Sequence, residues 1–292
     1  MTAVAGRLPI SAQRSSMSRV LAFVRRHILT LYALLAFTYL LVPVAVVIMF
    51  SFNNPAGRFN YTWQGFTFSN WVHWDAIPGL RSAVEISLEI AAISSISATI
   101  LGTLIALALV RYGFRGRGAT NFLIFLPMST PEIVLGASLL TLFLTMNVAT
   151  GFWTIVIAHI MFNISYVVVT VKARLIGFDR SLEEAAQDLG ATSWQTFRLI
   201  TLPLIMPGVL SAALLSFALS IDDFVITNFN AGSTVTFPVF IWGAARVRID
   251  PQIYVVASII FLFTLAMMLL TVWQQRRAER MAAVRPDEPE LA

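Results

Sequence analysis

Long apolar runs separated by short polar connections form the main pattern of the chain. A helix needs roughly 20 apolar residues to cross the hydrocarbon core of a bilayer. Six runs are long enough, near residues 28–50, 83–110, 122–144, 152–171, 200–221 and 253–273. Strands of a membrane barrel would be shorter and would alternate, whereas a helix satisfies its backbone polar groups within the segment. The pattern therefore predicts an all-α, polytopic membrane protein with six transmembrane helices.

The composition agrees with lipid as the solvent for much of the chain. Of the 292 residues, 58% are hydrophobic and 12% are charged, which is more apolar surface than a soluble domain of this length can bury. The chain has no cysteine, so disulfides and thiolate metal sites are excluded. Its net charge of +5 is spread between the apolar runs, so membrane lipid and not nucleic acid is an expected partner.

The basic residues are distributed unevenly between alternate connections. Sixteen of the 20 Lys and Arg residues lie in the tails 1–27 and 274–292 and in the loops 111–121 and 172–199. The other connections hold the remaining four, Arg58, Arg81, Arg246 and Arg248. Because Lys and Arg accumulate on the cytoplasmic side, we expect both tails in the cytoplasm around a transmembrane domain of residues 28–273. The first run is too long for a cleavable signal and should remain as an anchor.

A short polar stretch precedes the fifth run, on the side that this topology assigns to the cytoplasm. Ser181 stands three residues before Glu184, the spacing of a capping box at a helix start. One narrow helical face then carries Leu182, Ala185, Ala186 and Leu189. The opposite face carries Arg180, Glu183 and Gln187. Gly190 follows where a helix C-terminus favours the left-handed conformation, so a short helix is predicted to end there.

A second short helix is predicted directly after this glycine. Thr192 can cap it, and Trp194 and Phe197 would lie in it. Pro203 and Pro207 follow at the start of the fifth run, where proline is tolerated. Both short helices are therefore expected outside the membrane.

The first of these helices could rest on lipid headgroups or dock a cytoplasmic partner. Interfacial helices favour Trp, Phe and Leu opposite Lys and Arg, whereas this helix would turn an acidic face toward an anionic leaflet. Its apolar face includes Ala185 and Ala186, whose small side chains allow another backbone to come close. We therefore interpret it as a docking helix for a cytoplasmic protein.

The residues of this stretch follow a specific spacing. Glu184-Ala185-Ala186 is followed after three residues by Gly190, after nine more by Ile200, and after one more by Leu202-Pro203. In this order they resemble the EAA signature of permease subunits of bacterial ABC importers. The resemblance covers roughly residues 80–275 and implies that the EAA segment is a coupling helix lying in a groove of an ATP-binding subunit. It also implies a place in the bacterial inner membrane, a second permease, two ATP-binding subunits and an extracytoplasmic solute-binding protein.

A narrower resemblance extends over most of the chain. Its parts are "RYGFRGRG" at 111–118, "LPMSTPEIVLGASLL" at 126–140, "LIGFDRSLEEAAQDLGA" at 175–191 and "LSIDDFVITNF" at 219–229. Together they look like the second permease of spermidine/putrescine-type importers, which implies polyamines as the solute. Related permeases for other small solutes share parts of this pattern.

The chain shows no sequence of its own for ATP hydrolysis or covalent chemistry. A phosphate-binding loop needs a Lys after its glycine-rich turn, and the only lysine is Lys172, between Val171 and Ala173. We therefore expect no enzyme and no cofactor on this chain, with ATP bound by partner subunits. His27, His73 and His159 are scattered, and His159, inside the fourth run, is expected to form a hydrogen bond to a neighbouring helix.

The six runs hold acids but no Lys or Arg. Glu85 and Glu89 lie in the outer part of the second run, and they could mark a solute path, lie at headgroup level, or pair with Arg81. Asp222 and Asp223 lie at the outer end of the fifth run, where Asp222 could instead cap a following helix.

Glu132 lies near the middle of the third run, directly after Pro131 and one turn beyond Pro127. The prolines free backbone carbonyls beside a carboxylate, and acids without bases suit a cationic solute. Glu132, Asp222, Asp223, Glu85 and Glu89 are therefore the candidate substrate pathway.

The sequence thus predicts a permease subunit of an ATP-driven importer for polyamines. An ABC permease for another small solute is one alternative. A secondary cation transporter or channel would explain the acids but not the EAA loop. A membrane-embedded enzyme is disfavoured because His, Cys and Ser form no catalytic cluster in the sequence.

Overall fold

The computed structural model describes residues 16–57, 59–177 and 179–283. Most of the predicted N-terminal tail and the end of the predicted C-terminal tail therefore lie outside the described residues. In the described part, the regular secondary structure is helical, with two isolated bridges that join Asn53 to Phe66 and Phe59 to Ile249. The all-α prediction is confirmed.

The helices follow one another along the chain with short connections. In order they are α1 (Ser16–Ser51), α2 (Ser69–Val72), α3 (Leu80–Arg111), α4 (Arg117–Ser129), α5 (Glu132–Thr145), α6 (Phe152–Ile176), α7 (Ser181–Asp188), α8 (Ser193–Thr196), the π-helical turn η1 (Phe197–Thr201), α9 (Leu202–Ile221), α10 (Val225–Asn230), α11 (Phe237–Ala245) and α12 (Pro251–Ala283).

Five described helical segments are long and apolar enough to cross a membrane. They are His27–Ser51, Leu80–Arg111, Phe152–Ile176, Ser193–Ile221 and Pro251–Trp273. These segments match the first, second, fourth, fifth and sixth predicted runs, and α12 continues past the predicted end of the last run to Ala283.

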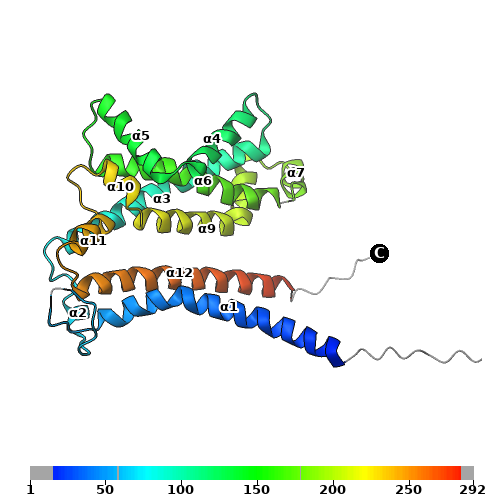
Figure 1. The fold of residues 1–292 in the computed structure, drawn as a ribbon. Helices are drawn as coiled ribbons and strands as arrows, with labels where there is room; N and C mark the ends of the chain where they lie inside the picture. Colours follow the sequence, from blue (N-terminus) through cyan, green and yellow to red (C-terminus); the bar gives the residue numbers. More distant parts are fainter. Residues whose placement is uncertain (1–15, 58, 178, 284–292) are drawn as a thin grey trace, which may run out of the picture.

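The third predicted run differs from the others because it is not one straight helix. α4 and α5 meet at a break of two residues and are bent by 108°, so together they form one broken span or a re-entrant loop. Pro131 explains the break, because the residue before a proline is driven out of the helical region, and Thr130 is extended (φ −86°, ψ 133°). The two helices diverge as a V (Figure 1).

The main core lies where α3, α6 and α9 pack together. Its buried residues are small or branched: Ala98, Ala106, Leu109, Val167, Val168, Val171, Leu175, Ile205 and Ala212. Gly102 allows α3 to approach α6 closely, since a Cβ there would lie 2.6 Å from a methyl carbon of Val167. Small residues at helix interfaces are typical of packing within a membrane.

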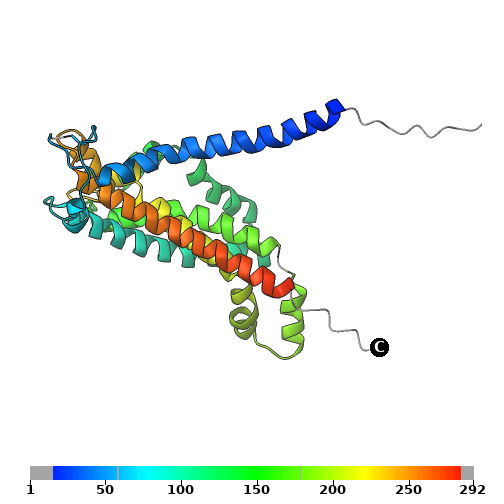
Figure 2. The same cartoon turned by 90° about the horizontal axis from the view of Figure 1, so that it is seen from below.

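α1 and α12 contact each other near the end where α2 and α11 lie and diverge from there toward the opposite end (Figures 1 and 2). The most apolar stretch of α1 has no buried residue, so its surface is open to lipid or to another chain. Figures 1 and 2 place α7 at the end of the molecule where α1 begins and α12 ends, with α2 and α11 at the opposite end. The start of α1 and the end of α12 therefore share a side with α7, as the topology prediction requires.

Candidate functional site

The polar stretch before the fifth span ends as the sequence predicts but begins differently. The predicted capping box is wrong: Ser181 is the first residue of α7, the preceding Arg180 makes no side-chain cap, and Glu184 pairs with Arg180. The Asp179 carboxylate accepts a hydrogen bond from the Ser181 amide (2.9 Å), which lowers the pKa of Asp179 and keeps it ionised beside the start of α7. At the other end Gly190 has φ +87° and donates to the Gln187 carbonyl (2.9 Å), while Ala191 donates to the Ala186 carbonyl (3.0 Å). These two bonds form a Schellman motif.

The outward face of α7 differs from the predicted one. Leu182 is 48% exposed, Leu189 is 90% exposed, and Ala185 is also exposed, so these three side chains present the surface available to a partner. Ala186, predicted on the same face, is buried, with an exposed fraction of only 8%. The predicted placement of Ala186 on the same exposed face is therefore wrong, because its side chain is buried against the rest of the chain.

The two adjacent glutamates of α7 have different environments. Glu184 is exposed and pairs with Arg180 (3.3 Å) one turn earlier. Glu183 was predicted on the solvent face, but its side chain is only 13% exposed, because Arg111 (2.8 Å) and Thr201 hold it against the body of the protein. The local sequence does not predict these two partners, since Arg111 lies 72 residues and Thr201 18 residues from Glu183.

The second short helix is confirmed, but it is the first turn of the fifth span. Thr192 and Gln195 exchange side-chain-to-backbone hydrogen bonds at its start (2.8 and 3.3 Å). The helix then continues through the π turn Phe197–Thr201 into α9. Pro203, at the start of α9, has no N–H to donate to the preceding turn, and missing helix hydrogen bonds of this kind accompany local changes of helix geometry.

The acids of α3 lie on an exposed surface. Glu85 accepts from the Arg81 guanidinium (2.8 Å), and Asp75 lies 3.9 Å from the same side chain. Glu89 is exposed as well. For Glu85 the structure selects the ion pair with Arg81 among the predicted alternatives.

His159 and Asp223 lie at the centre of a buried polar network between α6, α9 and α10. The His159 side chain is 2% exposed and that of Asp223 is 7% exposed. His159 Nε2 lies 3.1 Å from Asp223 Oδ2, and His159 Nδ1 lies 2.6 Å from Ser220 Oγ. A neutral imidazole that donates to the carboxylate and accepts from the serine satisfies both contacts. The predicted interhelical hydrogen bond of His159 is confirmed.

Asp223 also anchors the start of α10. Its carboxylate accepts from the amides of Ile226 (3.3 Å) and Thr227 (2.8 Å) and from the Thr227 hydroxyl (2.9 Å). The capping role considered for Asp222 therefore belongs to its neighbour Asp223. Asp222 is exposed, and its charge interacts with those of Asp223 and Glu132.

Glu132 lies in the first turn of α5, directly after the break in the third span, and is exposed. α5 is held to α10, since a Cβ on Gly136 would lie 2.9 Å from the Phe229 ring and Asn230 donates to the Gly136 carbonyl (3.3 Å). The break therefore brings Glu132 into electrostatic range of Asp222, although the two residues are far apart in sequence.

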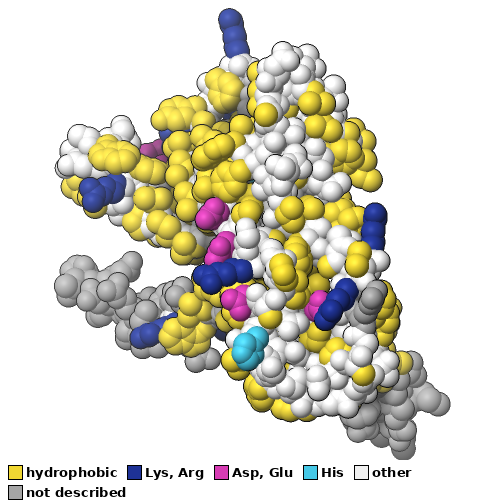
Figure 3. Space-filling view, turned by 90° about the vertical axis from the view of Figure 1, so that its left-hand side faces the viewer, with side chains coloured by type: hydrophobic (Ala, Val, Ile, Leu, Met, Phe, Trp, Pro, Cys, Tyr) yellow, Lys and Arg dark blue, Asp and Glu magenta, His cyan; other side chains and the backbone are white. Residues whose placement is uncertain are grey.

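Figure 3 shows the end of the molecule where α2 and α11 lie. Acidic side chains gather on this face with basic side chains among them (Figure 3). The described residues hold no group of three or more His, Asp or Glu side chains that could bind a metal ion. The acids of this face are therefore arranged as separate charges and not as a chelating cluster.

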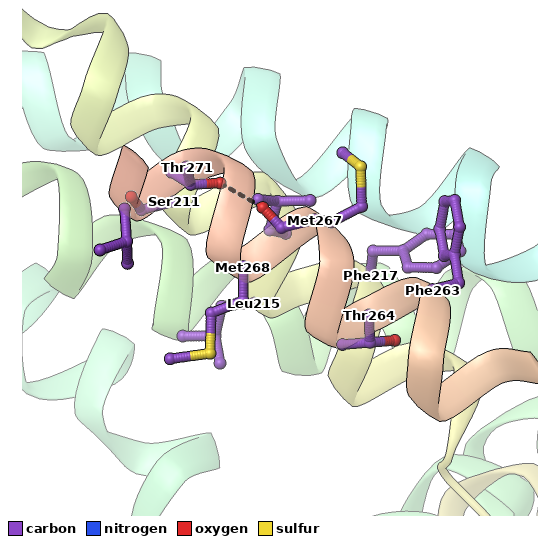
Figure 4. Close-up of a pocket in the computed structure, with 10 residues that line it drawn as sticks. Ser211, Leu215, Phe217, Phe263, Thr264, Met267, Met268 and Thr271 are labelled. Carbon is purple, nitrogen blue, oxygen red and sulfur yellow. Dashed lines mark hydrogen bonds between the residues drawn. The ribbon is translucent and has the colours of Figure 1, made fainter. Parts of the chain in front are cut away.

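The groove in Figure 4 lies between α9 and α12 and has a volume of about 390 Å³. Its lining includes Leu215, Phe217, Phe263, Met267 and Met268, and its hydroxyl groups bond to their own helices. Ser211 donates to the Pro207 carbonyl (2.8 Å) and Thr271 donates to the Met267 carbonyl (2.7 Å). The groove suits lipid or an apolar helix and not a charged solute.

The helices long and apolar enough to cross a membrane, with the exposed short helix α7 at one end of them, agree with a membrane transport subunit. The chain belongs to the family of binding-protein-dependent transport system inner membrane components, whose family model matches residues 98–281. The expected EAA-type permease family is confirmed.

Two relatives from Escherichia coli (strain K12) are similar over most of the chain. The spermidine/putrescine transport system permease protein PotC is 39% identical over 238 residues, which cover 80% of this chain and 88% of PotC. The putrescine transport system permease protein PotI is 40% identical over 236 residues, which cover 78% of this chain and 83% of PotI. Both relatives are transport subunits.

Solved structures with the same fold are also ABC transporters. A chain of a bacterial transporter that imports the acidic polysaccharide alginate aligns with a TM-score of 0.65 at 17% identity, over 89% of this chain and 99% of that chain. A chain of an amino acid ABC transporter aligns with a TM-score of 0.54 at 19% identity, over 73% of this chain and 100% of that chain. These similarities support the fold of the permease.

Proposed function

We propose that this chain is the membrane-spanning permease subunit of an ATP-driven importer for polyamines of the spermidine and putrescine type. The observation that carries this proposal is the similarity to PotC and PotI over about four-fifths of the chain. The acids that face outward at one end of the helical domain agree with a solute that carries several positive charges. An ABC permease for another small solute is the alternative.

The partners that we propose are a second permease, two ATP-binding subunits and an extracytoplasmic solute-binding protein. In this assembly α7 docks on an ATP-binding subunit through Leu182, Ala185 and Leu189, with Glu184 at the edge of the contact and Gly190 fixing the end of the helix. ATP binding would close the two ATP-binding subunits, draw the coupling helices together and open the bundle outward, and hydrolysis would reset it. ATP remains on the partners.

The proposed solute path begins at Asp222 and Glu132. A polyamine distributes its charges along a flexible chain, so separated carboxylates suit it better than one deep pocket. Asp222 would meet the solute where it leaves the binding protein, and Glu132 would meet it at the break of the third span. Glu85 and Glu89 lie on the outer surface of α3, where their charges would contribute only to the local electrostatic field. Asp223 supports this path as a structural residue.

The orientation that we propose places both tails and α7 in the cytoplasm. Because the chain has no cysteine, single substitutions can report accessibility without background from this subunit. Gln187→Cys should be protected from an impermeant thiol reagent in intact cells, whereas Val235→Cys should react. Labelling of Gln187→Cys from outside would contradict both the orientation and the docking role of α7.

Purification and uptake test the function directly. A tagged chain should purify with an ATP-binding subunit, and proteoliposomes with the binding protein should accumulate spermidine or putrescine on addition of ATP. Glu132→Gln and Asp222→Asn should each lower uptake roughly tenfold, since a charge-assisted contact contributes about 1.5–3 kcal/mol. Uptake without any ATP-binding subunit would favour a secondary transporter, and ATP-driven uptake of a neutral solute alone would favour another importer class.

A further inference from the structure

Glu183 joins three segments of the chain at one carboxylate oxygen. Arg111 Nη2 and Thr201 Oγ1 both donate to Glu183 Oε1, at 2.8 and 2.6 Å. Arg111 is the last residue of α3, and Thr201 is the last residue of the π turn that leads into α9. The side chains of Arg111 and Glu183 are 15% and 13% exposed, so this ion pair is much better shielded from solvent than the Arg180–Glu184 pair on the outer side of α7.

The same two helices, α3 and α9, are joined again toward the opposite end of the bundle. Ser94 Oγ on α3 and Ser220 Oγ on α9 lie 2.9 Å apart in the buried core, and Ser220 also contacts His159. Beyond this point, the Phe237 amide at the start of α11 donates to Ser87 Oγ on α3 (2.8 Å). α3 and α9 therefore form a frame that begins at Glu183 and ends beside the segments that carry Asp222 and lead into α11.

We propose that Glu183 is a positioning residue that passes movement of α7 into α3 and α9 together. This inference rests on the proposed function, in which α7 receives its movement from an ATP-binding subunit. α7 is a short helix with two exposed faces, and the glycine after it has a left-handed backbone with no atom within 4 Å of a Cβ position. The Glu183 contacts are a shielded polar link between α7 and both long helices, so a displacement of α7 can move α3 and α9.

The π turn contributes to this link by placing Thr201. A π turn adds one residue to a helical turn, and such turns are frequently found at functional sites. Thr201 is buried, with an exposed fraction of only 3%, and its hydroxyl donates to Glu183. The fifth span is therefore linked to α7 at the point where its backbone departs from a regular α-helix. Energetic coupling between distant sites is carried by connected contacts of this kind, and it must be shown by measurement.

The test uses the assembled importer with Val235→Cys, which lies in the connection before α11, as a reporter. The thiol-labelling rate at this position is measured with and without ATP and vanadate, together with the amount of ATP-binding subunit that purifies with the permease. In the otherwise wild-type complex, we expect ATP to change the rate by about fivefold or more, the lower end of the usual range of coupling between linked sites. Glu183→Ala and Thr201→Val should abolish this difference while the ATP-binding subunit stays bound.

Two variants serve as matched controls. Thr201→Ser keeps the hydroxyl, and Asp179→Asn removes one negative charge from the same loop while it keeps an acceptor for the Ser181 amide; both should retain the ATP-dependent difference. The inference is overturned if the wild-type reporter does not respond to ATP, if Glu183→Ala responds as the wild type does, or if Thr201→Val loses its ATP-binding subunit. Failure of the polyamine proposal would show separately, as an ATP-responsive complex that transports neither spermidine nor putrescine.

Discussion

Replacement of Asp223 by alanine distinguishes a structural carboxylate from one that meets the solute. Asp222 and Asp223 are adjacent in sequence, but only Asp223 is buried and bonded to His159 and to the start of α10. We expect Asp223→Ala to lower the stability of the folded permease, because the substitution removes the acceptor of two buried amides, those of Ile226 and Thr227. Asp222→Ala removes the same charge from an exposed position and should leave stability nearly unchanged.

The magnitude follows from the groups that lose their partner. Without the carboxylate, the amides of the buried residues Ile226 and Thr227 lose their acceptor in this network, whereas His159 Nε2 keeps the Thr227 hydroxyl at 2.9 Å. Each buried donor left without a partner costs about 1–3 kcal/mol, so the two together cost about 2–6 kcal/mol. Native domains have only about 5–15 kcal/mol of stability, so this is a large fraction. Asp223→Asn should cost less, because its amide oxygen can take the place of Oδ2.

The assay compares the thermal midpoint and the yield of monodisperse complex for Asp223→Ala, Asp223→Asn and Asp222→Ala. Asp223→Ala should give the lowest midpoint and yield, with uptake per folded complex reduced less than in Asp222→Ala. If Asp223→Ala unfolds at the wild-type temperature yet transports less than Asp222→Ala, then Asp223 contacts the solute and the reasoning from burial is wrong.

Three glycine and alanine positions give further predictions. Gly190→Val should weaken co-purification of the ATP-binding subunit with little change in thermal midpoint, because a left-handed conformation costs a branched residue about 1–2 kcal/mol at an exposed site; Gly190→Asn should be tolerated. Gly232→Ala should reduce folded yield, since its Cβ would clash with the Thr150 carbonyl oxygen, whereas Gly243→Ala, with no atom within 4 Å, should not. Ala186→Glu should lower the thermal midpoint in detergent, because it buries a carboxylate; an unchanged midpoint with loss of the ATP-binding subunit would restore Ala186 to the docking face.

The sequence predicts most of the fold because lipid requires long, continuous apolar helices. Five of the six runs match continuous helices, and the capping pattern at Thr192 and the glycine at position 190 locate the short helices correctly. The bend of the third run was not predicted, although Pro127 and Pro131 signal weakened helix geometry. Proline indicates that a helix can break, but the angle of 108° depends on the packing of α5 against α10 and of α4 against α6.

The faces of α7 show why a hydrophobic pattern alone can assign a side wrongly. Small residues can face a partner or face the chain's own core, and the pattern at 182–189 allows both. The ion pair of Arg111 with Glu183 decides the rotation of the helix, since it turns Glu183 and Ala186 inward and leaves Leu182, Ala185 and Leu189 outside. Arg111 lies 72 residues before Glu183, and no local rule connects them.

The candidate acids of the solute path also differ in environment in a way that their sequence positions do not reveal. The side chains of consecutive residues at a helix end point in different directions. Asp222 and Asp223 can therefore lie in different environments, although they are adjacent in the sequence and were both predicted to line the solute path. Asp223 faces His159, a residue for which the sequence already predicted a partner on a neighbouring helix, and a carboxylate within reach of that helix is the strongest acceptor available. Once Asp223 is bonded to His159 and α10, and Glu85 to Arg81, two of the candidate acids have lost most of their capacity to bind a cation. Asp222 and Glu132 are exposed and keep theirs, and Glu132 lies at the break that the sequence did not predict.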